Sequence, residues 1–161
     1  MSATAPASLT RRTALARELR HEIEIDVAPA AVWQTLTATD DYSWNPFMHR
    51  IAGNLAVGEK LRVEIEPPEG RIVKFKPTVL EVEQERKLRW LGRFLMPGLL
   101  DGEHSFELQP LDGGRTRFTQ SERFSGVLVG LFRSTLDKTE HGFAAMNEAL
   151  KRKAEEAETS S

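Results

Sequence analysis

Cysteine is absent from this 161-residue chain. Its absence excludes disulfide bonds, thiolate metal ligands and cysteine nucleophiles, so packing must supply the stability. Long apolar runs are missing too, because the clean ones, such as 127–129, fall far short of the roughly 20 residues that a membrane-spanning helix needs. The sequence therefore predicts no integral membrane association.

An excess of positive charge is also missing. Lys and Arg total 22 against 24 for Asp and Glu, which gives a net charge of −2. This balance provides no electrostatic attraction for a polyanion, so we expect no nucleic-acid partner. The histidines show no metal-ligand spacing, and the chain has no phosphate loop, dinucleotide fingerprint or Gly-x-Ser-x-Gly elbow. We therefore predict no metal site and no cofactor.

The length of the chain fits one domain. Residues 1–17 are rich in Ala, Ser, Thr and Arg and contain no acidic residue. We expect a flexible N-terminal extension there, with a transit peptide as the alternative interpretation. A single ligand-binding domain is expected over 18–154, followed by a polar, frayed tail over 155–161. The missing cysteines and the lack of a secretory apolar core favour a cytoplasmic location.

Hydrophobic periodicity predicts an α+β fold. Apolar and charged residues alternate over 19–27, as in a half-buried strand. Two short helices are expected next, one beginning at Pro29 and one over 41–47. Alternation then predicts strands near 60–66, 71–82, 87–95, 102–110 and 115–124. A final helix is expected over 127–152, because an apolar stripe steps by three or four residues through Leu128, Phe132, Leu136, Thr139, Phe143, Met146 and Leu150.

Several segments are similar to one known family. They are Val32-Trp33, Trp44-Asn45-Pro46-Phe47, Leu88-Arg89-Trp90-Leu91-Gly92, Gly102-Glu103-His104-Ser105-Phe106-Glu107-Leu108, Gly114-x-Thr116 and Ser121-Glu122-Arg123-Phe124-Ser125-Gly126. On these segments the chain resembles the SRPBCC superfamily, with its START-like, birch-pollen-allergen-like helix-grip fold, in the polyketide cyclase/dehydrase and lipid-transport branch. The resemblance implies a curved seven-stranded antiparallel sheet wrapped around the long C-terminal helix, two short helices after the first strand, and a hydrophobic cavity.

One cross-strand pair stands out in the predicted hairpin 102–124. A three-residue turn at 112–114 makes Leu108 oppose Phe118, Phe106 oppose Gln120, and His104 oppose Glu122. The Cβ atoms of opposed residues lie about 4.5–5.5 Å apart, so the imidazole and the carboxylate can touch. The pair is open to two interpretations, a polar contact for a ligand or a satisfied core pair that fixes the strand register.

Aromatic and apolar residues at the alternate strand positions that point inward predict the rest of a small-molecule pocket. Gly92 is at such a position, and its missing side chain leaves room for a ligand or marks a bulge. The candidate ligand-binding residues are Trp44, Phe47, Trp90, Gly92, Phe94, His104, Phe106, Gln120, Glu122, Leu128, Phe132 and Leu136.

The apolar hairpin tip over 95–100 has an unusual composition for a connection that faces water. It has three interpretations: it covers the mouth of the pocket, it packs on the protein's own surface, or it contacts a partner chain. In the third case a homodimer or partner contact would form through Leu95, Met96, Leu99 and Leu100.

Three functions remain open from the sequence. The first is binding of a small hydrophobic ligand that is lipid-like, aromatic or polyketide-like. The second is a cofactor-independent cyclase or dehydratase in which His104 and Glu122 act as an acid/base pair. The third is a protein-interaction or chaperone-partner module. The resemblance implies ligand binding more strongly than any reaction.

Overall fold

The computed structural model describes residues 16–94 and 96–161. The described residues form, in chain order, β1 (Ala16–Ile25), α1 (Pro29–Thr37), β2 (Met48–Ala52), β3 (Arg62–Ile65), β4 (Val73–Phe75), β5 (Thr78–Glu83), β6 (Lys87–Phe94), β7 (Leu100–Leu111), β8 (Arg115–Ser125) and α2 (Arg133–Thr159). Ala16 and Arg17 thus belong to β1, and the rest of the predicted N-terminal extension, 1–15, lies outside the described residues.

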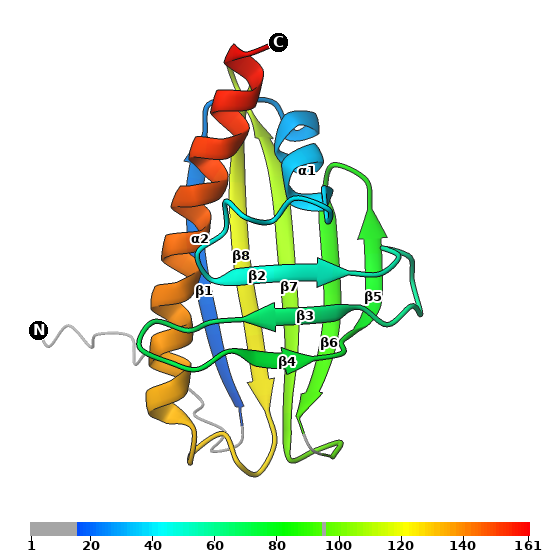
Figure 1. Cartoon of the computed structure of the whole chain (residues 1–161), viewed down its shortest axis with the longest axis vertical. Helices are drawn as coiled ribbons and strands as arrows, with labels where there is room; N and C mark the ends of the chain where they lie inside the picture. The colour runs from blue at the N-terminus through cyan, green and yellow to red at the C-terminus, as the bar shows by residue number, and fades with distance from the viewer. Residues whose placement is uncertain (1–15, 95) are drawn as a thin grey trace, which may run out of the picture.

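Two antiparallel sheets and one long helix make up the fold. The larger sheet has five strands in the order β1-β8-β7-β6-β5, and the smaller one has three in the order β2-β3-β4. The smaller sheet lies across the face of the larger one, α2 runs beside both sheets, and α1 sits at one end (Figure 1). The α+β class and the long C-terminal helix are confirmed. The single seven-stranded sheet is wrong, because the strands divide into two sheets.

The strands depart from the prediction at two irregularities of the backbone. The predicted strand 71–82 breaks before Pro77 into β4, which pairs with β3, and β5, which pairs with β6. Proline has no N–H to give to a continuous ladder. The sequence also misses β2, since the β2–β3 pairing shifts register between Met48 and Arg50. This bulge breaks the simple alternation by which a strand is recognised.

The predicted second helix over 41–47 is wrong. The side-chain oxygen Oδ1 of Asn45 accepts hydrogen bonds from the backbone N–H groups of Phe47 at 3.0 Å and Met48 at 2.8 Å. An asparagine that bonds the backbone ahead of it in this way competes with helix and favours a turn. The chain therefore turns at Asn45 and enters β2 directly.

The last helix begins later and ends later than predicted. The N–H groups of Val127 and Leu128 donate to the backbone oxygens of Gly98 at 3.2 Å and Leu99 at 3.0 Å. These bonds tie 126–132 to the β6–β7 tip as a turn, so α2 starts only at Arg133. Residues 155–159, predicted as a frayed tail, are its last turns. Neither helix of the described part is long and apolar enough to cross a membrane.

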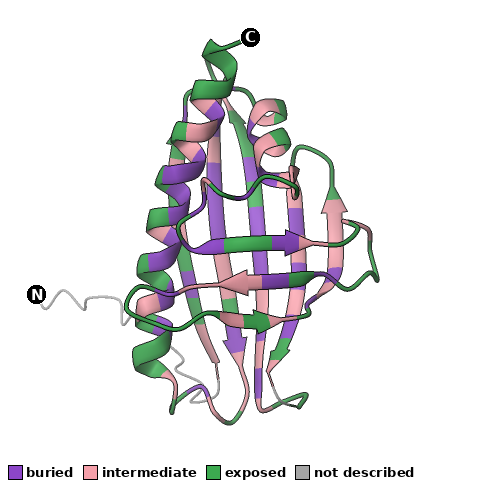
Figure 2. Cartoon of the chain, in the orientation of Figure 1, coloured by how far each residue is buried: buried purple, intermediate pink, exposed green. Residues whose placement is uncertain are grey.

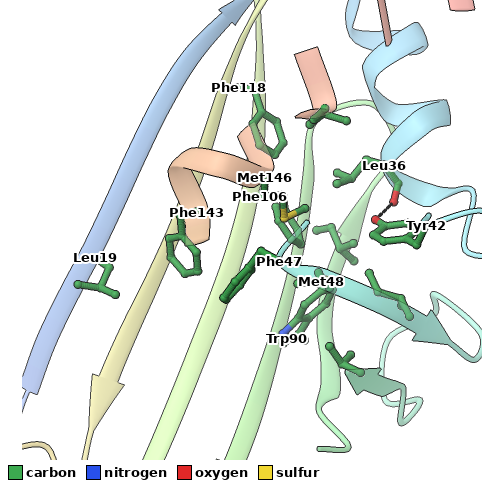
Figure 3. Packing of buried hydrophobic residues seen from close by; sticks show 14 of the residues in the cluster. Leu19, Leu36, Tyr42, Phe47, Met48, Trp90, Phe106, Phe118, Phe143 and Met146 are labelled. Atoms are coloured by element: carbon green, nitrogen blue, oxygen red, sulfur yellow. Dashed lines mark hydrogen bonds between the residues drawn. The ribbon is translucent and has the colours of Figure 1, made fainter. Parts of the chain in front are cut away.

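The buried residues lie on both sheets and on α2 (Figure 2), and they form one core cluster. Phe106, Phe118 and Phe143 are fully buried and are labelled in Figure 3. The ring of Phe106 meets that of Trp90 edge-to-face and stacks on that of Phe118. The hydroxyl of Tyr42 donates to the backbone oxygen of Leu36 at the α1 end. Burial raises the pKa of Tyr42, so this group stays a donor.

Gly142 allows a close approach between α2 and the segment that leads into β2. The ring of Phe47, just before β2, lies so near that a Cβ added to Gly142 would stand 2.2 Å from its Cδ2 atom. The same ring meets Phe143 edge-to-face, with 5.7 Å between centroids. A glycine inside the helix, which costs about 1 kcal/mol relative to alanine, is thereby explained by packing.

The first prediction concerns Phe143. Because its ring is fully buried, Phe143→Ala should lower the free energy of unfolding by about 3–5 kcal/mol, measured by denaturant titration. A loss below about 1 kcal/mol would contradict the packing described here.

The second prediction concerns Gly142. Gly142→Ala should lower the free energy of unfolding by about 1–3 kcal/mol, because the methyl group overpacks against Phe47 despite its better helix propensity. Ala145→Gly, at an exposed position of the same helix, is the control and should cost about 1 kcal/mol through propensity alone. A Gly142→Ala protein that is more stable than the wild type would show that the close approach is absent.

Candidate functional site

A cavity of about 160 Å³ lies between α2 and the inner faces of the two sheets. Its walls are mostly apolar. The lining residues are Phe47, Met48, Ile65, Pro67, Val73, Phe75, Trp90, Phe94, Leu100, His104, Glu122, Phe124, Phe132, Thr135, Leu136 and Thr139. His104 and Glu122 are the only ionisable groups among them, and no lysine or arginine of the described residues reaches this wall.

Strand register brings the polar pair into one row. Trp90 on β6 pairs with His104 on β7, and His104 pairs in turn with Glu122 on β8. The indole and imidazole rings stack with 5.2 Å between centroids and 18° between planes. The His104 Nδ1 atom lies 3.1 Å from Glu122 Oε2. The predicted His104–Glu122 contact is therefore present and faces the cavity.

Both ring nitrogens of His104 have a partner inside the protein. Nδ1 lies 3.1 Å from Glu122 Oε2. Nε2 lies 3.2 Å from the side-chain amide of Gln120. Both nitrogens of His104 are thus engaged inside the protein.

Glu122 is the polar group that is open to the cavity. Its side chain is 13% exposed, against 4% for His104. Its second oxygen, Oε1, makes no hydrogen bond within the described residues and occupies the space above Gly102, where an added Cβ would stand 2.5 Å from it. Gly102 therefore makes room for the carboxylate.

Most of the predicted ligand-binding residues line the cavity. Those that do are Phe47, Trp90, Phe94, His104, Glu122, Phe132 and Leu136, and those that do not are Trp44, Gly92, Phe106, Gln120 and Leu128.

The five predicted residues outside the lining have other positions. The indole nitrogen of Trp44 donates to the backbone oxygen of Asp41 at 3.1 Å, near the protein surface. Phe106 and Gln120 are fully buried behind the wall, and Leu128 belongs to the turn before α2. The space that Gly92 leaves holds the ring of Phe75, since an added Cβ would stand 3.3 Å from Phe75 Cδ2. Gly92 therefore makes room for an aromatic ring of β4.

The sequence missed several wall residues. Phe124 alternates onto the same face as Glu122 and was left out of the predicted site. Leu100 lies two steps of alternation before His104, so continuing the pattern along that strand would have found it. Val73 and Phe75 also alternate, but Pro77 hid the face of their strand. The other missed residues are Met48, Ile65, Pro67, Thr135 and Thr139.

Some residues of the hairpin tip lie at the cavity and others lie at the protein surface. Leu100 lines the cavity, Leu99 is half-buried, and Met96 is 61% exposed. Leu95 lies outside the described residues. Contact with a partner chain through this tip stays a prediction.

These features define a helix-grip protein with an internal, largely apolar cavity. The chain matches the family described as polyketide cyclase/dehydrase and lipid transport over residues 16–156. It belongs to that family, and with it to the SRPBCC superfamily. None of the curated proteins compared with the chain matches it.

Solved structures share the fold at low sequence identity. Protein MLL2253 from Mesorhizobium loti is 22% identical with a TM-score of 0.65, over 84% of this chain and 95% of that one. The Zhui aromatase/cyclase from a Streptomyces species is 16% identical with a TM-score of 0.72, over 87% and 94%. Ara h 8.0201 is 15% identical with a TM-score of 0.63, over 86% and 97%. At such identities the likeness concerns the fold alone.

The third prediction concerns the imidazole. Each ring nitrogen of His104 lies within hydrogen-bond distance of one side chain, Glu122 for Nδ1 and Gln120 for Nε2. Gln120→Leu should therefore shift the nitrogen-15 NMR signal of Nε2, and Glu122→Gln that of Nδ1. A His104 spectrum that stays unchanged in Gln120→Leu would contradict the arrangement of the three side chains.

Proposed function

We propose that the protein binds a small, largely apolar molecule in the internal cavity, with the His104–Glu122 pair as its polar contact. The observation that carries the proposal is the cavity itself, an apolar space that holds a single ionisable pair. Small-molecule sites typically combine apolar walls with a few polar groups that orient the ligand.

The size of the cavity supports a compact ligand. An apolar cavity of about 150 Å³ in another protein binds benzene. At about 160 Å³, this cavity suits a small aromatic group better than a complete lipid. A larger ligand would have to extend past the rim or displace side chains such as that of Phe47.

The engagement of His104 favours binding over acid–base catalysis. A general base needs a free lone pair within reach of the proton that it removes. Here Nδ1 lies 3.1 Å from Glu122 and Nε2 lies 3.2 Å from Gln120. In this arrangement His104 holds Glu122 in place, and the carboxylate is the group that meets the ligand.

Family membership is compatible with both binding and reaction. The family description joins cyclases and dehydrases with lipid transport, and the Zhui relative is an aromatase/cyclase. Turnover of a polyketone by this chain would favour the cyclase alternative, and His104→Ala should then lower the rate by about 10²–10⁴-fold.

The fourth prediction tests the cavity with naphthalene, an uncharged aromatic probe. Val73 lines the cavity, and the next residue of β4, Lys74, is exposed on the opposite face. Val73→Phe fills part of the cavity, so it should weaken naphthalene binding by about tenfold, or about 1.4 kcal/mol, in titration calorimetry.

Lys74→Phe is the matched control, since it adds the same ring to the same strand on the outer face. It should leave naphthalene affinity within about twofold. Equal affinities of the two variants, both at the wild-type value, would place the binding site elsewhere. Thermal melting of each variant checks that the fold is retained.

A further inference from the structure

The polar groups of the cavity wall include an acidic side chain but no lysine or arginine from the described residues. The wall residues that carry polar groups are Glu122, His104, Thr135, Thr139 and Trp90. The site therefore contains one negative charge. It has no permanent positive charge that could balance a second negative charge carried by a ligand.

Hydrogen bonds within the protein further limit which polar groups of the wall are free to contact a ligand. Both imidazole nitrogens of His104 are engaged, with Glu122 and Gln120. The hydroxyl of Thr139 already donates to the backbone oxygen of Thr135 at 3.0 Å, so toward the cavity it offers lone pairs. The free Oε1 atom of Glu122 is the strongest group left, and it is an acceptor.

From this inventory we infer that the cavity selects ligands whose polar end is a neutral hydrogen-bond donor, such as a phenol or alcohol, and rejects ligands that end in a carboxylate. The inference rests on the proposed function and names the chemical class of its ligand. The hydroxyl of the ligand donates to Glu122 Oε1, and the apolar body lies against Phe47, Trp90 and Leu136.

The physical basis is the difference between a charge-assisted hydrogen bond and a like-charge contact. A hydroxyl that donates to a carboxylate forms one of the stronger hydrogen bonds in proteins. Two carboxylates that share a site of low polarity cannot both stay ionised, so one must bind a proton or leave. An acidic ligand therefore loses affinity here.

Three naphthalene derivatives of similar shape test the inference near neutral pH. They are naphthalene, which has no polar group, 2-naphthol, which is a neutral donor, and 2-naphthoate, which is an anion. Titration calorimetry on the wild-type protein should show 2-naphthol binding about tenfold more tightly than naphthalene, and 2-naphthoate about tenfold more weakly.

Two substitutions separate the charge of Glu122 from its position. Glu122→Gln removes the charge, so the advantage of 2-naphthol and the penalty of 2-naphthoate should both shrink to within about threefold of naphthalene. Gly102→Ala keeps the charge but places a methyl group 2.5 Å from the present position of Oε1, so the carboxylate must move. It should remove the advantage of 2-naphthol while 2-naphthoate stays excluded. Glu103→Gln is the control, because Glu103 pairs with Arg89 on the outer face.

The outcomes distinguish this inference from the proposed function. Equal binding of all three probes to the wild-type protein would overturn the inference and leave the proposed function standing. Binding of none of them would overturn both. An unchanged ranking in Glu122→Gln would overturn the role of the carboxylate. If that variant fails to fold, the wild-type ranking and Gly102→Ala decide the question.

Discussion

The register of the β7–β8 hairpin is the constraint on which both the core and the site depend. The pairing of His104 with Glu122 and of Phe106 with Gln120 places one face of both strands toward α2. If β8 slipped by one residue against β7, Phe118 and Glu122 would turn to the face opposite Phe106 and His104. The two adjacent glycines of the turn, Gly113 and Gly114, adopt positive φ values of 78° and 70°, which only glycine accepts readily. The turn therefore holds the register that the apolar faces require.

Within that frame, a short chain of side chains decides what the cavity can recognise. Gln120 orients His104, His104 holds one oxygen of Glu122, and the other oxygen stays free above Gly102. Burying a carboxylate is costly without such partners. The arrangement therefore keeps one carboxylate oxygen free in a largely apolar space, and the smaller sheet and α2 close that space on its other sides.

Much of this could be predicted where the pattern was regular. Alternation along β7 and β8, with a short glycine turn between them, sufficed to pair His104 with Glu122. The prediction failed where the backbone was irregular, as at the β2 bulge near Met48, at the Asn45 turn and at the break before Pro77. It also misread Gly92, because the ring that fills its space comes from β4, and a sequence does not reveal which distant side chain approaches a glycine. The predicted cavity therefore lacked the wall residues of the smaller sheet, Met48, Ile65, Val73 and Phe75.

A crystal structure of the protein with 2-naphthol bound tests the central claim most directly. The account predicts the rings between Phe47, Trp90 and Leu136, with the phenol oxygen about 2.5–2.8 Å from Glu122 Oε1, as expected for a charge-assisted O–H···O hydrogen bond. The His104–Glu122 and His104–Gln120 contacts should persist in that complex. An empty cavity at saturating 2-naphthol, or a ligand whose oxygen points away from Glu122, would contradict it.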